Sequence, residues 1–369
     1  MRMRTGLLTL AVVLLLAGAL PVLGFAAGNT DAALEYFKTQ QNADGGFGSG
    51  FSPDSAVGST ADAVLAIVSA GGDLATFDQD GNTPLTYLAA NSPATGGDLS
   101  KQIMALVAAG QNPRDFGGID SVATLEGMVG ADGTIGTAND TFVAHTLAVL
   151  ALASVQRPIP AASIDLIKSG QQEDGSWAWD GTAGTAGDTN TTAFAVQALI
   201  AAGEAADGDA VTGALAYYKS IQNEDGGLPY QNPSDYGTAT DANSTAVVIQ
   251  AIIAAGQDPA GAGWTVAAGT PVAALAALQN ESGAFAWQAA VPDDNFLATV
   301  QALPALAGKA FPIATMNVGE LEAMPATAPE TMPETGGAVA NAAFLMLAGG
   351  LALAGSGLAL HRRRPATGK

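Results

Sequence analysis

Paired carboxylates are the residues of this sequence whose type and spacing best suit catalysis. Glu173 stands beside Asp174, and Glu224 stands beside Asp225 in a closely similar segment further along the chain. Two acids that flank a glycosidic bond can act as the general acid and the base or nucleophile of a glycosidase. Both pairs lie in a loop that recurs along the chain, and this favours a role in capping the loop over catalysis.

The composition restricts other kinds of chemistry. The chain has no cysteine, which excludes disulfides, thiolate zinc sites, catalytic thiols and internal thioesters. His145 is the one histidine outside the C-terminal tail, and because it lies in an apolar segment we expect it to pack rather than to catalyse. The acidic stretch 78–82 suggests calcium but does not follow EF-hand spacing. We therefore predict no metal and no cofactor, and an enzyme is the less favoured class.

The charge balance points to the kind of partner. The chain has 34 acidic residues and 13 Lys and Arg, of which six lie in the two ends, so the central part carries seven bases and a net charge near -27. Such a surface repels phosphate backbones and anionic lipid head groups. We predict no nucleic-acid partner and a ligand that is neutral or cationic.

The N-terminal end is typical of a secretory signal peptide. Arg2 and Arg4 precede the apolar run 7–23, and small residues follow it. We expect residues 1–27 to be removed on export.

The C-terminal end contains a short motif, an uncharged stretch at 338–360 and a basic tail. The motif consists of Met332, Pro333, Glu334, Thr335 and Gly336. The region 332–369 resembles a sortase cell-wall sorting signal, with methionine where that family has leucine. The resemblance implies a sortase partner, cleavage after Thr335 and attachment to the cell wall. The alternative is a single transmembrane helix over 338–360 with its arginines inside the cell. Both alternatives place the domain on the cell surface.

The segment 313–331 is rich in Pro, Thr, Ala and Glu. Its prolines at 325 and 329 cannot belong to one helix, so we predict an extended spacer that lifts the domain from the surface. The folded domain is then expected over residues 28–312.

Six related segments fill that domain. Residues 167–177 align with 218–228, and the apolar segments that follow them, 188–203 and 241–256, align without a gap. Alanine-rich runs, polar residues at N-cap positions and exit glycines predict helices. The loop glycines of the six units are expected to be Gly45, Gly96, Gly133, Gly175, Gly226 and Gly283. About twelve helices in six hairpins predict an all-α α6/α6 toroid, with the more apolar second helices inside; an open solenoid is the alternative.

The spacing Gln171-x-x-x-Gly175-x-Trp177 recurs in part at Gln41/Gly45/Phe47, Gln222/Gly226/Leu228 and Gln279/Gly283/Phe285. It resembles the glutamine-tryptophan repeat of squalene-hopene cyclases and the related repeat of prenyltransferase β subunits. The resemblance implies a terpenoid-cyclase-like toroid with a central cavity, in which the glutamine and the aromatic residue are structural. The Asp-x-Asp-Asp motif and the zinc-binding cysteine of those enzymes are missing, and this weighs against their activities.

Residues 299–312 resemble the last helix of the α domain of cobalamin carriers such as intrinsic factor and transcobalamin. That resemblance implies a bound corrinoid and no catalysis. Those carriers add a β domain, so a partner domain would be needed to complete the site here.

In this fold the N-termini of the inner helices gather at one mouth of the ring, and we expect the ligand there. The candidate ligand-binding residues are Asp62, Asp98, Asp140, Asp188, Asn190, Asp241, Asn243 and Asn295. Converging helix dipoles favour acceptor atoms, whereas the acids oppose a free anion, so a neutral, amide-rich or cationic ligand fits both. The alternative is that these residues only cap their helices. Gln197, Gln250 and Gln301 lie deeper and need partners.

The sequence thus favours an exported, surface-anchored, non-catalytic binding protein for a neutral small molecule, a corrinoid first. A divergent terpenoid-cyclase-like or carbohydrate-active enzyme is the alternative, and a surface adhesion module is a further one.

Overall fold

The computed structural model describes residues 28–235 and 237–319. The expected signal peptide, the sorting motif and the apolar stretch 338–360 lie outside these ranges. Among the described residues, no helix has both the length and the apolar character needed to cross a membrane.

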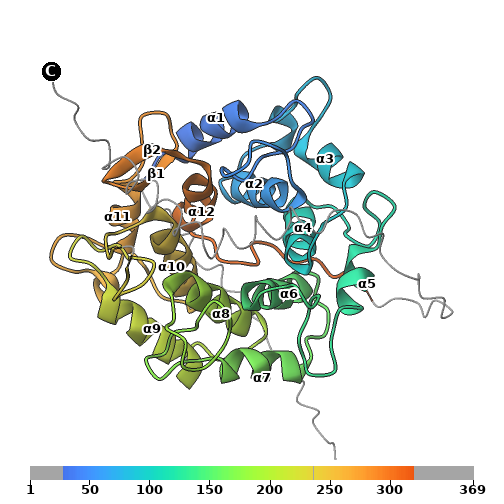
Figure 1. The fold of residues 1–369 in the computed structure, drawn as a ribbon. Helices are drawn as coiled ribbons and strands as arrows, with labels where there is room; N and C mark the ends of the chain where they lie inside the picture. Colours follow the sequence, from blue (N-terminus) through green and yellow to red (C-terminus); the bar gives the residue numbers. More distant parts are fainter. Residues whose placement is uncertain (1–27, 236, 320–369) are drawn as a thin grey trace, which may run out of the picture.

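Six inner helices form a closed ring (Figure 1). Each packs against the next in chain order, and the last packs against the first, so the chain is a toroid and not an open solenoid. The inner helices are α2 (Val57–Ser69), α4 (Gly96–Ala108), α6 (Phe142–Ser154), α8 (Thr189–Ala201), α10 (Ala242–Ala254) and α12 (Phe296–Leu306).

A second ring of shorter helices covers the first (Figure 1). The outer helices are α1 (Thr30–Gln40), α3 (Pro84–Ala90), α5 (Ser121–Glu126), α7 (Ala161–Ser169), α9 (Asp209–Ile221) and α11 (Pro271–Ala276). The twelve α-helices of the described ranges confirm the predicted toroid. Two 3-10 turns, η1 (Leu74–Thr76) and η2 (Ala262–Trp264), join outer and inner elements.

The sequence analysis did not predict a small antiparallel hairpin before α12. Strand β1 (Phe285–Gln288) pairs with β2 (Val291–Asn295) in the register Phe285 to Asn295 and Ala286 to Asp294. A two-residue turn separates the strands, and their alternation is too short to distinguish from a loop by pattern alone.

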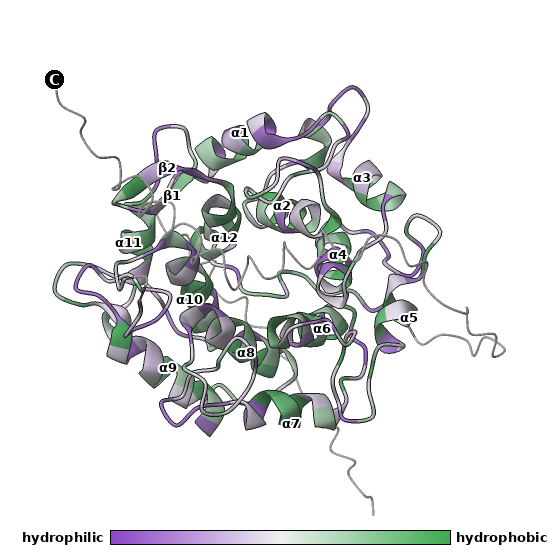
Figure 2. Ribbon diagram, in the orientation of Figure 1, coloured by the Kyte–Doolittle hydropathy of each residue, from purple (hydrophilic) through white to green (hydrophobic). Residues whose placement is uncertain are grey.

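The inner helices are apolar on nearly all sides because they pack against both neighbours, the outer ring and the cavity. In Figure 2 the hydrophobic colour predominates on α6 and α8. Alanines such as Ala148, Ala198 and Ala251 are fully or almost fully buried between neighbouring helices and let them approach closely. Since the ring closes on itself, residues 28–319 contain the whole core, and we expect them to fold alone.

A glutamine amide ties the repeat loop to the next unit in four of the six units. The Nε2 of Gln171 donates to the carbonyl of Gly175, at 2.9 Å, and to that of Ala210 in α9, at 2.8 Å. Gln41 and Gln222 make the same pair of bonds to their own loop glycine and to the following unit. The Nε2 of Gln279 donates to the carbonyls of Gly283 and Asn29, and thereby joins the last unit to the first. These bonds confirm the structural role that the repeat implies.

The aromatic position of the repeat is also structural. The side chains of Phe47, Trp177, Leu228 and Phe285 are fully buried. The backbone N–H of each donates to a hydroxyl on the fourth residue of the following inner helix. These acceptors are Thr60, Thr192, Thr245 and Thr299.

His145 occupies the same fourth position of α6. The Ile135 N–H donates to its Nδ1 at 3.1 Å, which leaves Nε2 to donate to the Ser163 carbonyl, also at 3.1 Å. Burial lowers the pKa of His145 and keeps the ring neutral. The predicted packing role is confirmed, and the histidine replaces the threonine of the other units.

The loop glycines allow adjoining units to touch. Gly45, Gly133, Gly175, Gly226 and Gly283 all have a positive φ, and a Cβ on any of them would overlap backbone of the next outer helix or its N-cap. Gly96 is an exception to the expectation, because it is the first residue of α4 and not part of a loop.

The chain leaves α12 as a segment that crosses the ring toward α5 (Figure 1). We call residues 308–319 the strap. The Phe311 N–H donates to Gln197 Oε1 at 2.8 Å, and the Met316 N–H donates to the Ser154 carbonyl at 2.7 Å. Arg114 and Arg157 both donate to the carbonyl of Gly319. The described start of the expected spacer, residues 313–319, therefore lies on the ring.

Replacement of Gly175 by alanine tests the contact between units. Gly175 has a φ of 90°, and its Cβ would overlap the backbone of Gly213 in α9. We expect a loss of roughly 2 to 5 kcal/mol in the free energy of unfolding, from the left-handed backbone and the overpacking together. Gly203→Ala is the control, because Gly203 has a φ of 95° but open space around the added Cβ. It should cost only about 1 to 2 kcal/mol. If urea unfolding gave the same loss of unfolding free energy for both variants, the contact between Gly175 and α9 would contribute nothing measurable.

Candidate functional site

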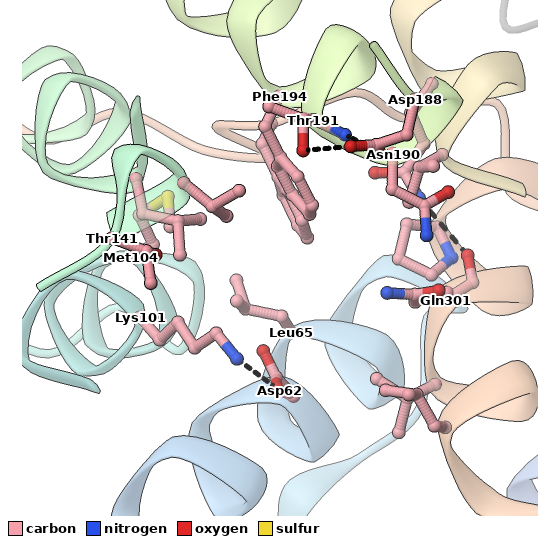
Figure 3. A pocket seen from close by; sticks show the side chains of 18 of the residues that line it. Asp62, Leu65, Lys101, Met104, Thr141, Asp188, Asn190, Thr191, Phe194 and Gln301 are labelled. Carbon is pink, nitrogen blue, oxygen red and sulfur yellow. Dashed lines mark hydrogen bonds and ion pairs between the residues drawn. The ribbon is translucent and has the colours of Figure 1, made fainter. Parts of the chain in front are cut away.

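A cavity lies inside the ring of inner helices (Figure 3). Its volume is about 70 Å³. Most of its wall is apolar, from Leu65, Met104, Leu147, Phe194 and Val247 of successive inner helices. Phe311 of the strap also lines it.

The first polar group of the cavity is an ion pair between two inner helices. Lys101 Nζ of α4 lies 2.7 Å from Asp62 Oδ2 of α2, and only 9 % of the lysine side chain is exposed (Figure 3). Burial raises the pKa of Asp62 above its usual value, although Lys101 opposes this. The two charges stay paired because a buried charge without a partner is strongly destabilising.

Asp188 forms the second polar group, on the opposite wall. As N-cap of α8 its carboxylate accepts from the Thr191 N–H at 2.7 Å and from the Thr191 hydroxyl at 2.8 Å. The Tyr230 hydroxyl also bonds to it. Burial raises the pKa of Asp188 to about 6 despite these bonds. Asn190, two residues further along the chain, lines the cavity beside Asp188.

Three amide side chains form the third polar group. Asn243 Nδ2 donates to Gln301 Oε1 at 2.9 Å, and Gln250 Nε2 donates to the Gln301 carbonyl at 3.2 Å. Gln250 Oε1 is buried and has no hydrogen-bond partner among the described residues. Gln197 lies outside this group, because its Nε2 donates to the Ala193 carbonyl of its own helix and its Oε1 accepts from the Phe311 N–H of the strap.

A second, wider hollow of about 380 Å³ adjoins the cavity at the mouth of the ring. It is lined by Asp98 together with serines of the 49–59 segment and parts of α2, α3 and α12. Burial raises the pKa of Asp98, and Lys101 partly offsets this.

The structure places the eight predicted residues in three different situations. Asp62, Asp188 and Asn190 line the inner cavity, whereas Asp98 lines the outer hollow with Asp62. Asn243 reaches the cavity only through Gln301.

The other three residues, Asp140, Asp241 and Asn295, stabilise local structure. Asp140 accepts from Thr137 and from the Gly96 N–H, at 2.7 and 3.1 Å, and so joins α4 to the loop before α6. Asp241 and Asn295 are the N-caps of α10 and α12. Asp188, Asp241 and Asn295 are caps as the alternative expectation had it, while α4 and α6 are capped by Thr95 and Thr141 instead of Asp98 and Asp140.

The aspartate of each acidic pair accepts hydrogen bonds within its repeat loop. Asp174 accepts from the N–H and hydroxyl of Ser176, and Asp225 accepts from the Gly227 N–H and the Thr240 hydroxyl. The carboxylate of Asp78 accepts from the Gly81 N–H within its own turn.

Sequence reasoning missed Lys101 and Tyr230. Lys101 is a single basic residue within an otherwise apolar helix, and a buried lysine nearly always has a partner, so it could have been found. Tyr230 lies in a loop after α9 and reaches Asp188 only through the fold, and no local pattern indicates this.

Comparisons with known proteins agree with this architecture. The squalene-hopene cyclase C-terminal domain matches residues 128–299, and the prenyltransferase alpha-alpha toroid domain matches residues 3–95. The fold and its cavity thus define an α-α toroid. These two segments of the chain are thus similar in sequence to toroid domains of those two kinds. No curated protein matches the sequence.

Several solved structures share the fold. A type II terpene cyclase from Scytonema in complex with merosterolic acid A is 15% identical, with a TM-score of 0.53, over 76% of this chain and 95% of that one. A glycosidase in complex with glucose is 14% identical, with a TM-score of 0.50, over 75% and 95%. Haptocorrin in complex with cobinamide is a more distant neighbour, 16% identical with a TM-score of 0.41, over 78% and 68%. At these identities the likeness is one of fold.

The two buried N-cap carboxyls predict a pH dependence of stability. Burial raises the pKa of Asp188 to about 6 and that of Asp241 to about 7. The folded state then binds more protons than the unfolded state between about pH 4 and pH 7, so stability should fall as pH rises through this window. Each carboxyl contributes up to about 1.4 kcal/mol per pH unit.

Urea unfolding at pH 5 and pH 8 measures this effect. The Asp188→Asn, Asp241→Asn double variant keeps both caps without the titration, so its stability should change much less. An equal change of stability with pH in the parent protein and in the double variant would contradict the assignment of this effect to Asp188 and Asp241.

Proposed function

We propose that this toroid is a non-catalytic binding protein that takes the apolar part of a neutral small molecule into its inner cavity. The proposal rests on the hydrogen bonds and the ion pair that the polar groups of the cavity wall make within the protein. The Asp62–Lys101 pair, the Asp188 cap and the Asn243–Gln301 contact each bond within the protein. Between them the wall is apolar, and such a wall binds by burying apolar surface.

The pairing of the charges in the cavity supports a neutral ligand. Asp62 is matched by Lys101, and the Asp188 carboxylate already accepts hydrogen bonds from Thr191. An anion would meet these carboxyls, and a cation would have to leave water for a mostly apolar space.

A corrinoid is a proposal for the outer hollow and not for the cavity. The inner volume of about 70 Å³ is too small for a flat, amide-rimmed macrocycle, whereas the hollow of about 380 Å³ opens at the mouth. A corrinoid lying there would expose one face, which a partner domain could cover. We further propose that the protein works outside the cell, held to the cell wall or membrane by residues 332–369.

A carbohydrate-active enzyme is the second candidate, on a specific observation. Asp62 and Asp98 both line the outer hollow. Burial raises the pKa of both carboxyls, and the charge of Asp62 raises the pKa of Asp98 further, whereas Lys101 opposes both shifts. Two acids in such surroundings can differ in protonation, as acid–base catalysis requires. The ion pair of Asp62 with Lys101 weighs against this candidate, because it occupies one of the two acids.

Filling of the cavity tests the proposal. Met104→Trp should occupy the cavity and raise the Kd of 1-octanol, a neutral apolar probe, at least tenfold in calorimetric titration of residues 28–335. Ile119→Trp is the matched control, since Ile119 is 45% exposed and lines neither hollow. Its Kd should equal that of the parent protein.

Titration with cobinamide and cobalamin, followed by absorbance, tests the corrinoid proposal on the same protein. Saturable binding that Met104→Trp leaves intact would place the corrinoid in the outer hollow. Failure of octanol, cobinamide and cobalamin alike to bind would remove the binding proposal and leave the adhesion alternative.

A further inference from the structure

The inner cavity and the outer hollow meet at one place. Asp62, Lys101, Leu297 and Val300 line both of them. The Asp62–Lys101 ion pair therefore stands at the neck between the two spaces, with Leu297 and Val300 of α12 on the other side of it. A molecule that occupies both spaces must pass beside this pair.

The outer hollow is the more polar of the two spaces, although part of its wall, at Ala56, Val57 and Phe296, is apolar as well. Its polar lining consists of serines of the 49–59 segment together with Tyr87, Asn91 and Ser92. The hydroxyls of Ser59, Tyr87 and Ser92 have no hydrogen-bond partner among the residues that the structure describes. Unpaired hydroxyls at the edge of a hollow can each donate one hydrogen bond and accept others.

An aromatic ring stands at the rim of the same hollow. Phe51 lines it and is 51% exposed, which is unusual for a side chain of this size. Its segment is held in place, because the N–H groups of Phe51 and Ser52 both donate to the Ser49 hydroxyl. An apolar ring beside free hydroxyls offers a face for the C–H side of a sugar ring and partners for its hydroxyls.

The net charge of the outer hollow excludes one kind of head group. Asp54, Asp62 and Asp98 face Lys101 in this lining, so carboxyls outnumber amines. A phosphate or carboxylate head would be repelled, whereas an uncharged, hydroxyl-rich head would not.

We propose that the two hollows form one site for an amphipathic ligand, with a neutral, hydroxyl-rich head such as a monosaccharide in the outer hollow and an apolar chain in the inner cavity. This inference rests on the proposed binding function and names the class of ligand. The ion pair at the neck marks the junction of head and chain. The small size of the inner cavity agrees with a chain and not with a complete ligand.

Three related probes test the joined site on residues 28–335, which contain the whole ring. Octyl glucoside below its micelle concentration carries both parts, 1-octanol carries the chain alone, and methyl glucoside carries the head alone. Octyl glucoside should bind at least tenfold more tightly than either of the others by calorimetry. Phe51→Ala should raise the Kd of octyl glucoside at least fivefold and leave that of octanol unchanged, and Ile119→Ala should change neither.

Each of the other outcomes contradicts a different part of the proposal. Octanol binding as tightly as octyl glucoside would overturn the head site and leave the proposed function intact. Methyl glucoside binding as tightly as octyl glucoside would overturn the joined site, since the chain would then contribute nothing. If neither octanol nor octyl glucoside binds, the proposed function fails together with this inference. Release of glucose from octyl glucoside would replace binding by catalysis.

Discussion

The contact on which this structure depends is the one between a glycine loop and the unit that follows it. At Gly175 the backbone approaches α9 so closely that no side chain fits between them, and the Gln171 amide donates across the same contact. Neither interaction is strong alone, because a hydrogen bond to a carbonyl contributes about 1 kcal/mol net. Their repetition sets the angle between successive hairpins, and at Gln279 and Asn29 the last of them closes the ring.

Closure explains why the inner helices can be so apolar and so rich in alanine. In an open solenoid the terminal helices would expose one face to water, and polar caps would be required. Here α12 packs on α2, so no inner helix has a free side. Asp188 lies at the N-terminus of its helix, and Lys101 and Gln301 point toward the cavity, so these polar groups are placed where packing against other helices is least. The site is thus the part of the inner ring that packing does not require to be apolar.

The predictable part of this fold is the part that repeats or is local. The glutamine, glycine and aromatic positions recur at fixed offsets, and from them the toroid, the inner and outer helices and the structural role of Gln171 follow. Asp188 and Asp241 stand directly before apolar helices and are caps for local reasons. Asp62 and Lys101 are 39 residues apart and meet only because α2 and α4 are neighbours in the ring, so a sequence pattern shows their types but not their pairing. Gly96 and the β1–β2 hairpin escaped prediction because those units depart from the repeat.

The strap determines where a pulling force on the C-terminal end acts on the domain. Force applied to the chain beyond residue 319 enters the fold at the Gly319 carbonyl, which Arg114 and Arg157 hold against Asp120 and Glu126 of the α5 region. The strap is attached to the ring by hydrogen bonds at Thr315, Met316 and Phe311 and by apolar side chains such as Ile313 and Val318 that pack on the core. Phe311 also forms part of the cavity wall. A mechanical load that detached the strap would therefore open the inner cavity, whereas the contacts that close the ring lie elsewhere.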